Sequence, residues 1–197
     1  MREQIRAGIV HVGRALREPE EFAERWRAGA VRYNGWVWTS LLATAILGTV
    51  TYGMTMGLLG GASQIFSKAF VCTFAAGMAW TIALPALYVL NSLAGSKLSI
   101  SSTVLAALVT VSWGGLAMMA SIPINWFFTT AIPHPGFVLV VNLVVFAGVG
   151  VAMIDVFRRV MHRLEPDRGT YPAWWLCLVA ALGCELFFQL GLFTFAG

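Results

Sequence analysis

Long apolar blocks separated by short polar stretches dominate this chain after its first 35 residues. Five blocks are each about as long as the ~20 apolar residues that an α-helix needs to cross a bilayer. They cover residues 36–57, 69–93, 101–123, 137–157 and 173–195. The pattern predicts an all-α, polytopic integral membrane protein, with a five-helix transmembrane domain in residues 36–197.

The more polar residues 1–35 predict short amphipathic helices on the cytoplasmic side. Apolar side chains recur at helical spacing, at Ile5, Ile9, Val12 and Leu16. Pro19 suits the first turn of a second helix, on which Phe22 and Trp26 lie one turn apart. Two interpretations stay open because both bury the apolar stripe. The helices lie on an anionic leaflet, or they form a cap packed against the bundle.

Charge placement is an independent signal for topology. With five spans, all of the 13 Lys and Arg residues except Lys68 fall on one side of the membrane. Because cytoplasmic loops carry the excess of basic residues, we expect a cytoplasmic N-terminus and an external C-terminus. The main inner loop follows the fourth span. We expect its arginines to contact lipid head groups or a partner protein; they are Arg158, Arg159, Arg163 and Arg168.

The amino-acid composition supports a membrane protein over a soluble one. Apolar residues make up 58% of the chain and charged residues 11%, whereas roughly 25% of a soluble globular protein is charged. The basic residues flank apolar spans, so the net charge of +4 indicates membrane lipids rather than nucleic acid as the neighbour. Cys72, Cys177 and Cys184 lie inside apolar blocks without a CxxC pair, which supports neither a disulfide framework nor a metal site.

Glu185 is the ionisable side chain that falls well inside a predicted span. It lies roughly 18 Å along the fifth helix, near the middle of a ~30 Å hydrocarbon core. A charge there costs at least about 3 kcal/mol. Gln189 is one turn away on the same face, and Asn142 in the fourth span is a candidate cross-helix partner. These three residues form the predicted intramembrane polar site.

Two interpretations of Glu185 remain open. It relays a proton or cation, or contacts a ligand; alternatively, it is a structural carboxyl hydrogen-bonded between helices or to a partner subunit. A relay needs a chain of polar groups or water, and few polar residues surround it in sequence, so the structural role is favoured. We find no HExxH, GxSxG, P-loop or paired haem histidines, which predicts a protein that is not an enzyme and has no cofactor or metal.

Three short motifs accompany this layout: residues 17–22 (REPEEF) before the first span, residues 84–88 (LPALY) in the second, and residues 95–97 (GSK) before the third. With these motifs the chain resembles the Yip1-like family of five-span membrane proteins. That resemblance implies closely packed helices, a cytoplasmic N-terminal region and a very short outer C-terminus. It also implies a role through protein partners, because eukaryotic relatives act in vesicle trafficking.

Together these features predict a non-enzymatic integral membrane scaffold or accessory subunit in a bacterial plasma (inner) membrane. Its expected partners are membrane lipids and other membrane protein subunits. A small transporter or channel component that uses Glu185 is the second hypothesis. A lipid-handling membrane protein is the third.

Overall fold

The computed structural model describes residues 10, 12–13, 15–29, 35–168 and 175–195, which form helices and turns with no strand among them. The elements are α2 (Pro19–Arg27), α3 (Gly35–Met56), the 3₁₀ turn η1 (Leu58–Gly60), α4 (Gly61–Leu93), α5 (Ile100–Ala131), α6 (Pro135–Leu164) and α7 (Trp175–Gln189). Four of them, α3 to α6, are long and apolar enough to cross a membrane. The all-α prediction is confirmed for the described residues, and the four apolar helices fit an integral membrane protein.

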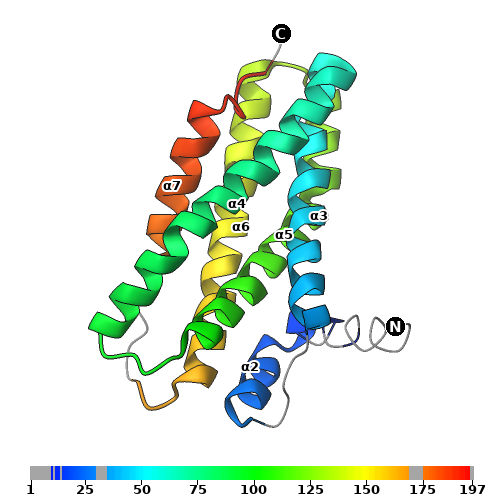
Figure 1. Ribbon diagram of the computed structural model, residues 1–197. Helices are drawn as coiled ribbons and strands as arrows, with labels where there is room; N and C mark the ends of the chain where they lie inside the picture. The colour runs from blue at the N-terminus through cyan, green and yellow to red at the C-terminus, as the bar shows by residue number, and fades with distance from the viewer. Residues whose placement is uncertain (1–9, 11, 14, 30–34, 169–174, 196–197) are drawn as a thin grey trace.

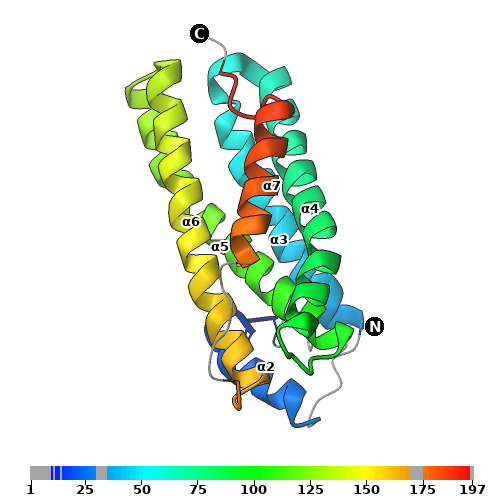
Figure 2. The same ribbon diagram turned by 90° about the vertical axis from the view of Figure 1, so that its left-hand side faces the viewer.

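The long helices run side by side, and α2 lies across one end of the bundle (Figure 1). Helix α3 packs against both α4 and α5, while α6 packs on α5 and α7 packs on α4. Figure 2 shows α7 between α4 and α6. We call the end that carries α2, the turn between α4 and α5, and residues 165–168 the α2 end. The far end carries η1 and residues 190–195.

Glycines set the closest helix contacts, as expected for membrane helices. A Cβ at Gly48 of α3 would lie 2.2 Å from the backbone oxygen of Gly115 in α5. A Cβ at Gly53 would lie 2.8 Å from the Cα of Ala69 in α4. The helices therefore pack closely at Gly48 and Gly53, and α3 lies between α4 and α5 in the bundle.

Three helices are longer than the predicted spans, and α6 is one of them, since it continues to Leu164. α4 already begins at Gly61, and α5 continues through Pro123 to Ala131. A proline removes its own N–H from the helix, and in membrane helices neighbouring groups satisfy the carbonyl that is freed. The predicted connection after the third span therefore shrinks to residues 132–134, and Pro135 opens α6.

Helix α7, by contrast, is shorter than the predicted fifth span. It ends at Gln189 because Gly191 takes a left-handed φ of 70°. The Leu192 N–H then donates to the Phe187 carbonyl at 2.8 Å, which closes a Schellman motif. With 15 residues, α7 is about 22 Å long, less than the ~30 Å core. Residues 173–174 of the predicted span lie outside the described part of the chain.

Helix α2 forms a cap on the bundle. Its apolar side chains Phe22 and Ala23 are buried in the core next to α6. The Trp26 indole donates to the Ser102 hydroxyl at the start of α5, at 3.0 Å. Of the two interpretations of this apolar stripe, the structure matches the packed cap for α2.

Candidate functional site

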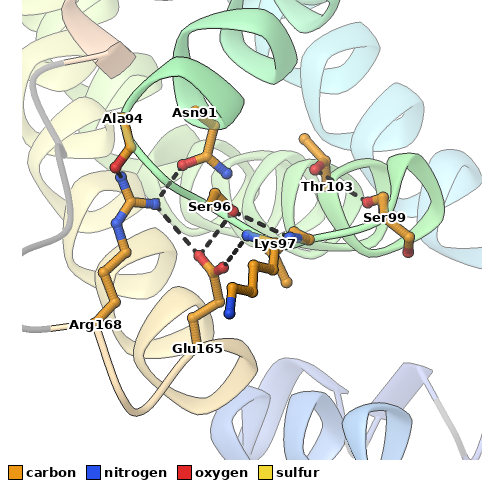
Figure 3. Close-up of polar contacts among 9 residues, drawn as sticks. Asn91, Ala94, Ser96, Lys97, Ser99, Thr103, Glu165 and Arg168 are labelled. Atoms are coloured by element: carbon orange, nitrogen blue, oxygen red, sulfur yellow. Dashed lines mark hydrogen bonds and ion pairs between the residues drawn. The ribbon is translucent and has the colours of Figure 1, made fainter.

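A polar network joins the ends of α4, α5 and α6 at the α2 end (Figure 3). The Glu165 carboxylate directly follows α6. It accepts hydrogen bonds from the Ser96 hydroxyl at 2.8 Å and from the Lys97 backbone N–H at 2.7 Å. Arg168 lies 3.3 Å from the same carboxylate, and the two side chains are only 14% and 13% exposed. This shielded pair fixes the turn between α4 and α5 against the end of α6.

Arg168 also terminates α4. Its guanidinium donates to the Asn91 side-chain oxygen at 2.6 Å and to the Ala94 carbonyl at 3.2 Å (Figure 3). The last carbonyls of a helix lack amide partners, and a cation is favourable beside them. The guanidinium of Arg168 is therefore occupied by its own chain, with the capping of α4 as one of its roles.

Ion pairs attach α2 to α6. Glu20 of α2 lies 3.8 Å from Arg159 and 3.3 Å from Arg163, and Glu24 lies 3.8 Å from Arg163. Within α6, Arg159 also contacts Asp155 at 2.9 Å. The side chains are more than a third exposed, so each pair contributes little stability by itself. Their joint effect is to orient α2 on the bundle.

The four arginines predicted to contact lipid or a partner therefore differ in their surroundings. Arg159, Arg163 and Arg168 pair with acids of the same chain. Arg158 is exposed and has no ion pair within the described residues. The prediction that these arginines contact lipid head groups or a partner protein stays open for all four. Among them, Arg158 is the one whose charge no described carboxylate neutralises.

A cleft of about 410 Å³ opens beside the Glu165 network. Its walls come from the end of α2, the turn between α4 and α5, and the residues that follow α6. Its lining residues are Arg27, Gly95, Lys97, Leu98, Leu164, Glu165, Pro166, Asp167 and Arg168. Lys97 and Asp167 are exposed, and in the described part of the chain neither side chain has an ion pair. Sequence reasoning missed this cleft because it joins three segments that are distant in the chain.

Polar contacts inside the bundle involve Asn142 but not Glu185. The Tyr52 hydroxyl donates to the Asn142 side-chain oxygen at 2.8 Å, and Asn142 donates to the Val138 carbonyl. Both side chains are fully buried, and their contact joins α3 to α6. The expected pairing of Asn142 with Glu185 is replaced by the pairing with Tyr52. A tyrosine inside an apolar block is itself a signal, because a buried hydroxyl usually has a hydrogen-bond partner.

Glu185 and Gln189 lie together on an exposed face of α7. The Gln189 amide donates to the Glu185 carboxyl, as their spacing of four residues predicts. No other described side chain hydrogen-bonds to Glu185. Three small residues, Cys177, Ala181 and Cys184, are exposed on the same helix. Of the three residues of the predicted polar site, Glu185 and Gln189 thus form a pair on the outside of the bundle, and Asn142 lies apart from them inside it.

Lys68 is the basic residue that the charge pattern left on the other side, and it is almost completely buried. Its amino nitrogen lies 2.5 Å from the Gly191 carbonyl, 2.9 Å from that of Leu192 and 2.6 Å from that of Thr194. The Phe195 ring centroid is 5.7 Å away. Lys68 therefore holds the segment after α7 against α4. Its separation from all other basic residues was the available sequence signal.

The described residues contain no group of three or more His, Cys, Asp or Glu side chains that could hold a metal ion. Comparisons of the chain with protein-family models, with curated proteins and with solved structures gave no match. The Yip1-like resemblance accordingly stays a prediction.

Proposed function

We propose that this protein is a non-enzymatic scaffold or accessory subunit of a membrane protein assembly, and that the exposed face of α7 contacts its partner. The single observation that carries the proposal is the position of Glu185 and Gln189 on that face. A carboxyl group in contact with lipid is costly even when one amide bonds to it. A partner helix that covers this pair would remove both groups from hydrocarbon and satisfy their remaining hydrogen-bonding capacity.

The neighbouring side chains support close approach of another helix. Cys177, Ala181 and Cys184 recur at helical spacing on the exposed surface of α7, and small residues allow helix backbones to come near one another. The interaction would then combine packing along this surface with hydrogen bonds at Glu185. Phe188, 76% exposed on the same helix, would add apolar area.

The proposal includes a topology. Helices α3 to α6 cross the membrane, α7 crosses with residues 190–195 extending its path, and the α2 end faces the cytoplasm. The positive charge of the α2 end supports this orientation, which leaves the C-terminus outside a bacterial plasma membrane. The layout also fits the Yip1-like family, in which we propose to include the chain.

Replacing Glu185 tests the proposal. The full chain carrying Glu185→Leu should lose its partner when it is purified from native membranes in a mild detergent. Glu185→Gln, which keeps both hydrogen-bonding ability and size, should retain the partner and serves as the matched control. A chain that is always isolated alone, or a Glu185→Leu variant with an unchanged complex, would argue against the subunit role.

A flux assay separates this proposal from the transporter hypothesis. In reconstituted vesicles, a subunit without transport activity should give no proton or cation flux above that of empty vesicles. Flux that is lost in Glu185→Gln while assembly stays normal would replace the scaffold proposal with a carrier in which Glu185 is the ion-binding group.

A further inference from the structure

We propose that the cleft at the α2 end binds the head group of a phospholipid that carries a primary ammonium, with its phosphate between Arg27 and Lys97 and its ammonium at Asp167. The site is distinct from the α7 face and does not depend on what that face binds. Three observations carry the proposal: the position of the cleft relative to apolar surface, the charges that remain unpaired around it, and the rigidity of its walls.

The cleft lies where apolar helix surface gives way to polar chain. Leu93 at the end of α4 is 80% exposed and Ile100 at the start of α5 is 62% exposed. The polar turn between them carries Lys97, which lines the cleft. A phospholipid matches this order, because its acyl chains need apolar surface next to a polar head-group site. A ligand that was wholly soluble would gain nothing from Leu93 and Ile100.

Three cations line the cleft. The charge of Arg168 is neutralised by a carboxylate, whereas Arg27 and Lys97 are exposed. Arg168 is paired with Glu165 and occupied by the end of α4. Lys97 has no ion pair in the described part of the chain. The Arg27 guanidinium gives one long hydrogen bond of 3.4 Å to the Arg163 carbonyl and has five donors in total. Lys97 and Arg27 are thus the donors available to a phosphate.

Asp167 decides between lipid classes. It lines the same cleft, is exposed, and has no ion pair with another described residue. Beside an anionic lipid such as phosphatidylglycerol it would repel the bound phosphate. An ethanolamine head group offers Asp167 an ammonium with three N–H donors, whereas the quaternary ammonium of choline has none. The charge pattern therefore favours phosphatidylethanolamine over both other lipids.

The walls of the cleft are held in place before a ligand binds. Glu165 ties the turn that carries Lys97 to the residues that follow α6 (Figure 3). Arg168, one residue after Asp167, is tied to the end of α4. Less side-chain and loop ordering is then needed on binding, which favours affinity. The volume of about 410 Å³ lies within the range typical of small-ligand sites, roughly 300–1,000 Å³.

Lipid titration of the full, delipidated chain in detergent tests this site, with binding followed by native mass spectrometry. Dioleoyl phosphatidylethanolamine should bind one per chain and outcompete the phosphatidylcholine and phosphatidylglycerol of the same chain length.

Lys97→Gln should weaken the binding of phosphatidylethanolamine about tenfold, the effect of one lost charged contact. Asp167→Asn should remove the preference over the other two lipids. Arg17→Gln, at an exposed cation outside the cleft lining, is the matched control and should change nothing.

Each contrary result overturns a defined part of the proposal. An equal loss in Arg17→Gln would mean general attraction of lipid to positive charge rather than a site. An unchanged preference in Asp167→Asn would remove the ammonium contact. Glycerophosphoethanolamine, which lacks acyl chains, should compete at least about a hundredfold more weakly, since each buried CH₂ contributes ~0.8 kcal/mol. If it competes equally, the ligand is a soluble phosphate ester. Thermal unfolding of each variant identifies losses caused by misfolding, and all three replaced side chains are exposed.

Discussion

The two ends of the bundle hold their basic residues in opposite ways. At the α2 end, arginines pair with carboxylates: Arg163 with Glu20, and Arg168 with Glu165. At the far end, Lys68 is surrounded by neutral backbone oxygens and an aromatic ring. One end thus distributes its polar contacts over several pairs with different exposure, while the other concentrates them on one side chain.

This difference shows what each end contributes. Exposed ion pairs are individually weak, so the α2 end can exchange one contact for another and still leave charges free for a ligand. The buried amino group of Lys68 has no such freedom, because removing it takes a donor from the carbonyls of Leu192 and Thr194. The far end is therefore a structural closure, and the α2 end is a surface suited to binding.

The largest effect is expected from Lys68→Met. Methionine has a similar volume, but the carbonyls of Leu192 and Thr194 would lose the Lys68 donor, while the Gly191 carbonyl would keep the Thr194 hydroxyl at 2.7 Å. Unsatisfied buried groups cost about 1–3 kcal/mol each, and water at the bundle end can satisfy some of them, so we expect a loss of about 3 kcal/mol. The free energy of unfolding, measured by SDS titration in detergent, should report it.

Lys97→Met provides the control for Lys68→Met. Both changes delete one lysine amino group, but the Lys97 side chain is exposed and unpaired among the described residues. Its replacement should change stability by no more than about 0.5 kcal/mol. Equal effects of the two variants would contradict the proposed contrast between the ends. Hydrogen exchange at the Leu192 amide should accelerate in Lys68→Met alone.

An intermediate effect is expected from Glu165→Gln. Glutamine can still accept one of the hydrogen bonds from the turn. It no longer neutralises the charge of Arg168, although both side chains of the pair are shielded from solvent and that of residue 165 is only 13% exposed. Hydrogen bonds to charged groups contribute about 1.5–3 kcal/mol, and the guanidinium keeps its contacts with α4, so we expect a loss of about 1–2 kcal/mol by the same SDS titration. Asp167→Asn, two residues away and unpaired within the described chain, should be near neutral.

The sequence was sufficient to predict the class of fold. Apolar block length and the placement of basic residues both pointed to membrane helices, and four helices of the required length are present. The end of α7 was mispredicted because hydropathy records whether residues are apolar, whereas Gly191 ends the helix through backbone conformation. The end of α5 was also mispredicted, because the predicted span ended at Pro123 whereas the helix continues past this proline.

The candidate site was predictable only where its contacts are local. Glu185 and Gln189 meet because they are four residues apart on one helix. The pairing of Asn142 with Tyr52 and of Lys68 with Gly191 connects positions far apart in the chain. Such contacts depend on how the helices are arranged and rotated, which a single amphipathic pattern does not determine when nearly every face is apolar.

The smallest effect should come from the ion pair between Glu20 and Arg163, which measures how weak the exposed contacts of the α2 end are. Glu20→Gln, Arg163→Gln and their combination form a double-mutant cycle that isolates the pair. Both side chains are more than a third exposed and 3.3 Å apart, so we expect a coupling of about 0.5 kcal/mol. At about 1 M salt the Debye length falls to about 3 Å, and the coupling should nearly vanish. A coupling above about 2 kcal/mol, or one that is insensitive to salt, would mean that α2 is held as firmly as the segment bound by Lys68 and that the two ends do not differ in kind.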